Sequence, residues 1–472
     1  MAITIDTNFW ISLIGTLFVC GFAGFTFGSI IVYFLTTNIR SKEKNAIFLS
    51  IATLALAIVV NALFWISPWQ ILWNSGVFFV AIFAGYFWAV RGILNLEFEA
   101  PLPEAIPVQA EDKKAVVVLA RGESEDYMPL PMIEEFRKKD ETKVSQTPKW
   151  GRVFDLYKLK RKYNKISKYQ DTVSAEEIKE NKPKNPYKNI YHKILEDLEK
   201  SFLKVDIYQE AFVNDWPFLN QALIKAIAQG AEEITIFNLL LSENYYYNQA
   251  INTMKKIDYS ELGIDINQTE FLADSERIQR YVAEKVQDAF PKGKDMKSAG
   301  VLLIAEGQPK EWDELYNQTQ PEIQFREGVK EQLIDLGFKE DLIEFAWIYN
   351  DREPTIKQGL ETLAKKGCNT IIHVASTIPI DCLASLVDIP MAVEKVNLPN
   401  VEFIEVGAWN FDDELIKVYL NRITETKELP LKNLALESAI VIRTTALDKE
   451  EKIKEENDAN TDISEDKIIE ED

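Results

Sequence analysis

The chain has 472 residues, enough for more than one domain, and a formal net charge of −21. From Asp448 to the end, twelve Asp or Glu and four Lys give a net charge of 4 − 12 = −8, without any aromatic residue, so residues 446–472 are predicted to be a disordered acidic tail. The remaining charge, near −13, excludes nucleic acid as an expected partner.

Three apolar stretches near the N-terminus predict a membrane anchor over residues 1–94. Two gaps, 7–39 and 45–90, contain no charged residue. The second gap is too long for one span and is interrupted at Pro68, so it is predicted to form two helices. The expected spans are about 9–35, 46–66 and 69–93.

The basic loop Arg40–Lys44 sets the expected orientation, because positively charged loops stay in the cytoplasm. The N-terminus is then expected outside, and everything after about residue 94 in the cytoplasm, as part of an integral membrane protein. The lipid bilayer is one expected partner, and the apolar helices could bind other membrane proteins. Gly24 and Gly28, four residues apart, could let two helices approach closely.

The soluble body contains an internal repeat. It follows a predicted linker, residues 95–113, which holds three prolines and acidic residues without an apolar period. Residues 115–124 read as an apolar strand ending in Ala-Arg-Gly, and residues 300–309 as an apolar strand ending in Ala-Glu-Gly. The body therefore consists of two related segments.

The repeat continues later in each segment. Residues 224–237 and 360–374 each predict a helix that ends at a glycine and is followed by a continuous apolar strand. Continuous apolar strands are typical of parallel sheets covered on both faces, and strands alternate with helices throughout. The expected fold class is α/β, with two similar flavodoxin-like halves with parallel sheets, 114–290 and 291–445.

Ligands of such folds bind beyond the carboxyl ends of the strands, so the loops that follow the strands are expected to surround one cleft between the halves. Glu306 and Asp381 are the candidate catalytic residues of these loops. The candidate substrate-binding residues are Arg121, Gly122, Ser242, Gly307, Ser376 and Thr377.

Residues 365–389 carry a family resemblance. A helix end at Gly367 is followed by a buried strand, a loop and a new helix that opens at Asp381. This stretch resembles the signature of ferrochelatases, in which a strand leads through a loop to an Asp-x-x-Glu-Thr-Leu helix. The body is similar to the ferrochelatase and class II chelatase superfamily over most of residues 114–425. The resemblance implies two chelatase-type halves and insertion of a divalent metal, such as iron, into a porphyrin in heme biosynthesis.

The resemblance also implies which residues would carry that chemistry. Glu306 stands where the family has a histidine that takes pyrrole protons or holds the metal. Ala384 stands where the family has a glutamate that assists from the opposite side. Asp381 matches the family's aspartate, which caps a helix, and it could also supply a second carboxylate. Ser242 is similar in place to a serine that closes a family loop.

Three functions stay open. Glu306 could act as the base or metal ligand of an active ferrochelatase-type enzyme. The site could instead bind a tetrapyrrole, a porphyrin or heme, without inserting metal. Arg121 and Glu306 could also face each other in an ion pair that closes the cleft of a non-enzymatic structural or assembly protein. Loss of both acid–base groups, each typically contributing about 10²–10⁴-fold, favours tetrapyrrole handling with catalysis lost or altered, as in a pseudoenzyme.

The insertion at residues 149–169 is strongly basic and interleaved with aromatic side chains. It lies where chelatases carry a lipid-facing lid, and contact with anionic lipid is expected. The alternative is a solvated helix packed through its aromatic residues. Residues 176–187 are predicted to be a second linker. Of the two histidines, His373 is expected in the core and His192 on the surface, while Cys368 and Cys382 are expected to be small buried side chains.

Overall fold

The structure is a computed structural model, and its described residues form two compact units. They are residues 7–36, 40–63, 68–96, 111–141, 147–166, 184–201, 204–259, 261–349 and 351–428. One unit contains residues 1–100 and 126–165, and the other contains residues 101–125 and 166–472. The predicted acidic tail lies outside the described residues, as do most of the predicted linkers 95–113 and 176–187.

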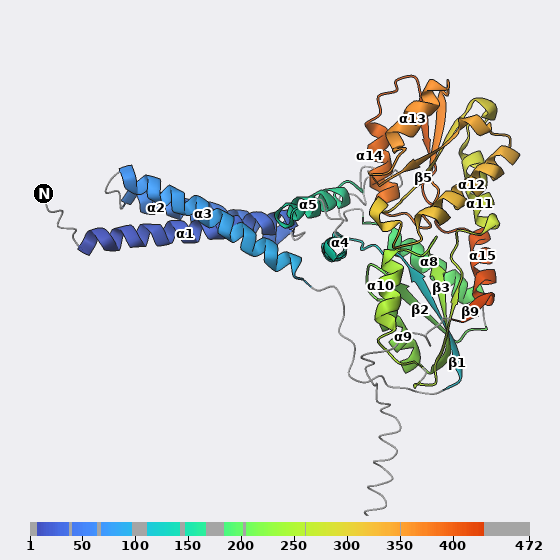
Figure 1. The fold of residues 1–472 in the computed structure, drawn as a ribbon, viewed down its shortest axis with the longest axis horizontal. Coiled ribbons are helices and arrows are strands. Elements are labelled where there is room, and N and C mark those ends of the chain that lie inside the picture. Colours follow the sequence, from blue (N-terminus) through green and yellow to red (C-terminus); the bar gives the residue numbers. More distant parts are fainter. Residues whose placement is uncertain are drawn as a thin grey trace, which may run out of the picture. The chain divides into compact units, whose positions relative to one another are not determined.

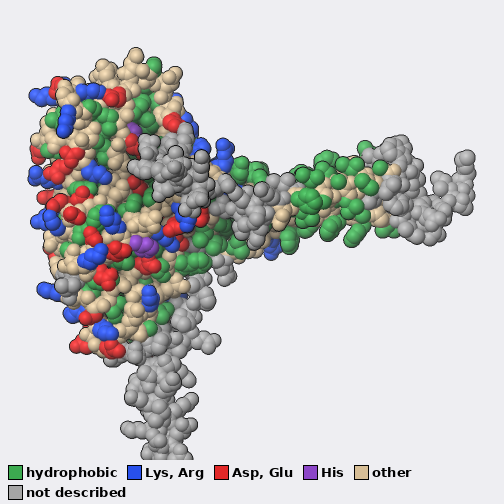
Figure 2. Space-filling view, turned by 180° about the vertical axis from the view of Figure 1, so that it is seen from behind, with side chains coloured by type: hydrophobic (Ala, Val, Ile, Leu, Met, Phe, Trp, Pro, Cys, Tyr) green, Lys and Arg blue, Asp and Glu red, His purple; other side chains and the backbone are tan. Residues whose placement is uncertain are grey.

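The first unit contains three long helices, α1 (Thr7–Thr36), α2 (Arg40–Leu63) and α3 (Pro68–Leu94). Two helical stretches, Ile14–Thr36 and Leu72–Leu94, are long and apolar enough to cross a membrane, with 28% and 11% of their most apolar windows buried. Figure 2 shows apolar side chains covering the rod that these helices form. Many side chains of α2 lie outside the described residues, so three spans and their orientation stay a prediction.

Glycines bring α1 and α3 into direct backbone contact. A Cβ atom on Gly28 would lie 2.0 Å from the carbonyl oxygen of Ile82, and one on Gly85 would lie 2.0 Å from that of Phe25. Gly24 meets the Phe78 carbonyl at 2.3 Å in the same way. Only glycine fits at these positions, so the predicted close approach at Gly24 and Gly28 is confirmed, with α3 as the neighbour.

The basic insertion belongs to this first unit. It forms a short 3₁₀ turn, η1 (Lys149–Gly151), and α5 (Arg152–Tyr163), and α4 (Leu130–Glu141) precedes it in the same unit. Val153 of α5 packs with Val32 and Val90 of the long helices. The expected first half, 114–290, is therefore interrupted by a segment whose apolar residues pack against α1 and α3.

The second unit begins with a sheet of order β2-β1-β3-β4-β9, in which β1 to β4 are parallel and β9 is antiparallel (Figure 1). Strand β1 lies inside the sheet between β2 and β3 and is buried from residue 115 to 120, as its continuous apolar run predicts. The strands are β1 (Lys113–Ala120), β2 (Ile207–Phe212), β3 (Ala231–Leu239), β4 (Asp265–Thr269) and β9 (Thr426–Glu428), and the helices are α8 (Tyr187–Ser201), α9 (Leu219–Ala228), α10 (Tyr245–Met254) and α11 (Glu276–Ala289).

The second sheet repeats this topology, with parallel strands in the order β6-β5-β7-β8. Its central strand β5 is buried throughout. The strands are β5 (Gly300–Ala305), β6 (Ile343–Trp347), β7 (Thr370–Ala375) and β8 (Glu402–Glu405). The helices are α12 (Thr319–Asp335), α13 (Ile356–Lys365), α14 (Ile389–Glu394) and α15 (Asp413–Thr424), with a π-helical turn over Ala384–Asp388 before α14.

Glycines mark equivalent points of the two halves. Gly122 after β1 and Gly307 after β5 have φ values of +79° and +75°. Gly230 and Gly367, which end the helices before β3 and β7, have φ values of +97° and +91°. These left-handed conformations favour glycine, and their repetition confirms the predicted duplication of the α/β body.

The last helix of each half packs with the other half. Helix α11 lies beside α12, whereas α15 lies beside α8, and β9 then joins the first sheet next to β4 (Figure 1). One buried apolar cluster consequently continues from the first sheet through α11 and α15 to the second sheet. The expected boundary at residue 290 separates β1 to β4 from β5 to β8. Helix α11, which precedes this boundary, packs against the second half, and α15, the last helix, packs against the first half.

Candidate functional site

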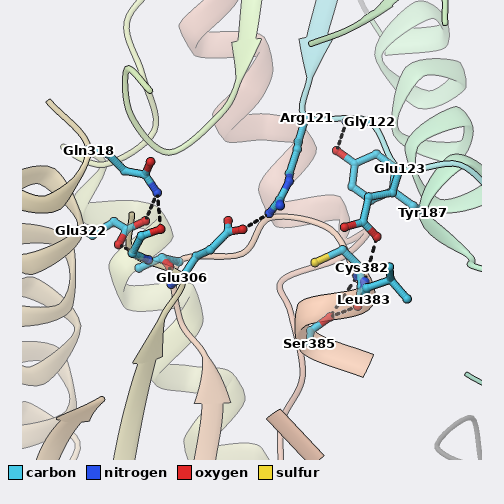
Figure 3. A network of polar contacts seen from close by, with 12 residues as sticks. Arg121, Gly122, Glu123, Tyr187, Glu306, Gln318, Glu322, Cys382, Leu383 and Ser385 are labelled. Atoms are coloured by element: carbon cyan, nitrogen blue, oxygen red, sulfur yellow. Dashed lines mark hydrogen bonds and ion pairs between the residues drawn. The ribbon is translucent and has the colours of Figure 1, made fainter. Parts of the chain in front are cut away.

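The loops after the two central strands face each other across the halves of the α/β unit (Figure 3). Arg121 follows β1 and Glu306 follows β5, and the Nη1 atom of Arg121 donates a hydrogen bond to the Oε1 atom of Glu306. Each side chain is 29% exposed. The structure therefore contains the ion pair that the equivalent loop positions predicted.

Two carboxylates act on the charge of Arg121. Partial burial disfavours its charged form, but the negative charges of Glu306 and Glu123 outweigh that effect and raise the pKa of Arg121 further above its ordinary value. Arg121 is therefore a fixed cation between the halves, and a guanidinium is well suited to hold a carboxylate.

Glu123 links the same loop to the other half. Its Oε2 atom accepts hydrogen bonds from the backbone N–H of Leu383 and from Nδ2 of Asn185, both at 2.8 Å. Burial raises the pKa of Glu123, although the charge of Arg121 opposes the shift. The first loop thus contacts the second half at two points, through Arg121 and through Glu123.

A second carboxyl group, Glu322 of α12, lies beneath the Glu306 loop. It accepts hydrogen bonds from Gly307 N at 3.0 Å and from Gln318 Nε2 at 2.9 Å. Burial raises the pKa of Glu322 to about 7. The hydrogen bond from Gln318 lowers this pKa, whereas the negative charge of Glu306 raises it. The protonation of Glu322 therefore changes near neutral pH, directly beside the ion pair.

Asp381 lies in the loop before the π-helical turn and accepts hydrogen bonds from residues later in the chain. Its two carboxylate oxygens accept hydrogen bonds from Ser385 Oγ at 2.8 Å, from Ala408 N at 3.2 Å and from Asn410 Nδ2 at 2.7 Å. These contacts fix the loop before the helix against the loop after β8. The π-helical turn begins after Leu383 without a side-chain cap, so the capping role expected of Asp381 is not observed. A catalytic role for Asp381 stays a prediction.

Most of the other candidate binding residues are engaged inside the protein. Ser376 is fully buried, and its hydroxyl donates to Ile304 O at 2.8 Å. The hydroxyl of Thr377 accepts a hydrogen bond from Glu306 N at 3.2 Å, and Gly122 N donates to the hydroxyl of Tyr187 at 3.1 Å. Ser242 is also buried. Ligand binding by these groups would require their burial or their internal contacts to change, whereas Arg121 and Glu306 remain partly exposed.

The histidines and cysteines lie where the sequence predicted. His373 is buried in β7, where burial lowers its pKa to about 4, and His192 is exposed and lies 2.7 Å from Glu210. Cys368 and Cys382 are buried. Among the described residues, no group of three or more His, Cys, Asp or Glu side chains could hold a metal ion. A resident metal centre therefore has no ligand set in this part of the chain.

Aromatic packing adds to the contact between the halves and was not anticipated from the sequence. Tyr245, at the start of α10, packs against Trp312 and Tyr316 of the other half, with ring centroids 5.1 and 5.5 Å away. Tyr245 and Trp312 are buried. The run of three tyrosines at 245–247 was the available signal, but a run of aromatic residues does not identify its partner.

The arrangement is suited to holding an anionic group more than to moving protons. Glu306 is the candidate base that the sequence suggested, and its carboxylate is already bound by Arg121. Ala384 supplies no acid or base, and it is buried within the π-helical turn. The accessible groups are thus a guanidinium and the carboxylate paired with it.

Known proteins resemble the chain only distantly. No family model and no curated protein matches it. Several solved structures are similar to the chain. SirB from Bacillus subtilis with Fe³⁺ is 16% identical over 66% of this chain and 95% of its own, with a TM-score of 0.41. The cobalt complex of the sirohydrochlorin chelatase SirB from Bacillus subtilis subspecies spizizenii is 14% identical, covers 66% and 94%, and has a TM-score of 0.39.

A further neighbour is a multi-domain protein from Deinococcus radiodurans, described as structurally similar to chelatases. It is 12% identical over 68% of this chain and 57% of its own, with a TM-score of 0.41. These three neighbours are thus described as SirB, a sirohydrochlorin chelatase, and as a protein with structural similarity to chelatases. Likenesses at this distance carry no argument about the activity or ligand of this chain.

Proposed function

We propose that the chain is a membrane-anchored, chelatase-like protein that binds a tetrapyrrole and has lost the acid–base route of metal insertion. The observation that carries the proposal is the ion pair between Arg121 and Glu306. It provides a partly exposed guanidinium between the two halves, and tetrapyrroles carry carboxylates on their rim that a guanidinium binds well. The same pair occupies Glu306, which would otherwise be the candidate base.

A chelatase that uses Glu306 would need this carboxylate to leave Arg121 before it could accept a pyrrole proton or hold iron. Arg121 already donates a hydrogen bond to the Oε1 atom of this carboxylate. Binding of the ligand by Arg121 would compete with Glu306 for the same guanidinium.

A binding titration tests the proposal. The full-length protein in detergent is titrated with sirohydrochlorin or protoporphyrin, and quenching of the ligand's fluorescence reports binding. Saturable binding should weaken about tenfold or more in Arg121→Met and should tighten in Glu306→Gln, which frees the guanidinium. Lys417→Met, a change of an exposed lysine on α15, should leave binding unaltered. No saturable binding of either tetrapyrrole would overturn the proposal.

A second candidate function, a structural or assembly protein without a ligand, is favoured by the contacts between the halves. The Glu123 hydrogen bond to Leu383 and the packing of Tyr245 on Trp312 join the halves without any ligand. If neither tetrapyrrole binds and Glu306→Gln only destabilises the fold, the result would favour the structural or assembly function over tetrapyrrole binding.

Membrane anchoring is the other part of the proposal. The apolar windows of α1 and α3 are mostly unburied, and Phe18, Phe83 and Trp88 are exposed by 75%, 63% and 66%. Core helices of a soluble protein would bury such side chains, so a bilayer is the environment that suits them. The protein should stay in the membrane fraction after extraction at alkaline pH and need detergent for release, with the α/β unit open to cytoplasmic protease.

A further inference from the structure

Helix α5 has two different faces. Its buried side chains are Arg152, Val153, Leu156 and Lys160. The opposite face exposes Phe154, Lys158 and Arg161, which are spaced four and three residues apart and so lie on one side of the helix. Trp150, just before α5, is 52% exposed and Phe154 is 47% exposed. The outward face therefore combines large apolar groups with cations.

Contacts place α5 beside the C-terminal ends of α1 and α3. The ammonium group of Lys160 donates to the carbonyl oxygen of Phe34 at 2.9 Å, close to the end of α1. The hydroxyl of Tyr86, on α3, donates to the carbonyl oxygen of Trp150 at 2.7 Å. The apolar windows of these helices end at Thr36 and Leu94, so α5 lies at the level where the apolar surface stops.

Helix α5 and the two residues after it carry a strong net positive charge. Residues 152–165 contain six Lys or Arg and one Asp, a net charge of 6 − 1 = +5 in a chain whose total is −21. Asp140 on α4 already pairs with the buried guanidinium of Arg152. Lys158 lies 2.7 Å from Asp155, but a pair this exposed contributes little and leaves the lysine available to another anion.

We propose that the outward face of α5, formed by Trp150, Phe154, Lys158 and Arg161, binds the headgroups of anionic phospholipids at the membrane surface. Aromatic rings favour the headgroup level of a bilayer, and nearby Lys and Arg each add roughly 1 kcal/mol of attraction to anionic lipid. The attachment of α5 to the apolar helices, through Val153 and Lys160 of its buried face, favours a membrane over a soluble acidic partner. The inference rests on the proposed membrane anchoring and is independent of ligand binding at Arg121.

The test compares the full-length protein with the double variant Lys158→Gln/Arg161→Gln. Fluorescent phosphatidylglycerol or phosphatidylcholine is titrated into each protein in detergent, at low and high salt. The variant should bind phosphatidylglycerol roughly tenfold or more weakly, with less salt dependence, since each cation contributes roughly fivefold. The matched control, Lys357→Gln/Lys417→Gln, removes two exposed lysines of the α/β unit and should bind like the original protein.

Two results would overturn the inference: equal binding of both lipids, or an equal loss in the control variant. Competition of phosphatidylglycerol by an acidic peptide at the same concentration would instead assign the face to a protein partner and also contradict it. Failure of the anchoring itself is distinguishable, because the protein would then be released from membranes without detergent. Adding vesicles should shift the tryptophan emission of the Trp150→Ser variant less than that of the Trp216→Ser variant. Trp216 is an exposed tryptophan of the α/β unit.

Discussion

Arg121 and Glu306 stand at equivalent positions of a duplicated fold and carry opposite charges. Each follows the first strand of its half, which is the second strand in the order of its sheet, and each precedes a glycine with positive φ. Their hydrogen-bonded pair joins the two halves at the point where the carboxyl ends of both sheets meet. The duplication thus provides two matching loops, and the opposite charges of Arg121 and Glu306 make them complementary.

The pair should be measurable as a coupling energy. Arg121→Ala and Glu306→Ala should each lower the free energy of unfolding, and the double variant should recover about 1–2 kcal/mol relative to the sum of the single effects. Chemical denaturation of the full-length protein in detergent, followed by tryptophan fluorescence, gives the four values. Strictly additive effects would mean that the contact contributes nothing to stability.

Glu123 should act mainly as a hydrogen-bond acceptor. Glu123→Ala leaves Leu383 N and Asn185 Nδ2 without their shared partner, and a lost partner for buried donors typically costs about 1–3 kcal/mol. Glu123→Gln keeps an acceptor oxygen and should cost clearly less. Equal losses in both variants, measured by the same denaturation experiment, would show that the negative charge of Glu123 matters more than its hydrogen bonds.

The stability of the α/β unit should depend on pH near neutrality because of Glu322. Its folded-state pKa is about 7 against an ordinary value of 4.5, so its stabilising contribution is complete below about pH 4.5 and is lost as the pH rises through 7. Unfolding free energies measured from pH 5 to 8 should fall by roughly 1–3 kcal/mol from this group. Glu322→Gln should flatten that part of the curve, and an unchanged slope would exclude Glu322 as its source.

The close approach of α1 and α3 should tolerate no side chain at Gly28. Gly28→Ala places a methyl group against the backbone of Ile82, and overpacking of this kind costs about 1–3 kcal/mol. Gly15→Ala is the matched control on the same helix, because nothing lies within 4 Å of its Cβ position. Thermal unfolding in detergent should show a lower midpoint for the first variant and an unchanged or higher one for the second.

The sequence was sufficient to predict the duplicated α/β body, because its signals are local. Apolar strands ending in Ala-Arg-Gly and Ala-Glu-Gly, and helices ending at Gly230 and Gly367, recur at matching points. That symmetry suggested the pairing of Arg121 with Glu306 as one of three alternatives, and the structure contains this pair. The burial of His373 followed from its place in an apolar strand.

Other features depend on contacts between distant segments and could not be predicted. No local pattern indicates that α15 packs beside α8, or that β9 pairs with β4. Nor does any local pattern indicate that Val153 of the basic insertion packs with Val32 and Val90 of the first unit. The pKa of Glu322 likewise results from burial and from neighbours far away in sequence, which composition alone does not show.

The most direct test of the proposed function is metal insertion by the full-length protein. Sirohydrochlorin or protoporphyrin, bound at saturating protein, is mixed with Co²⁺ or Fe²⁺ under reducing conditions, and the absorbance of the metallated product is followed. We predict saturable binding with an insertion rate no higher than that of the free tetrapyrrole, in the original protein and in Glu306→Gln alike. Insertion that is faster with protein and is lost in Glu306→Gln would contradict the account and establish a chelatase that uses this carboxylate.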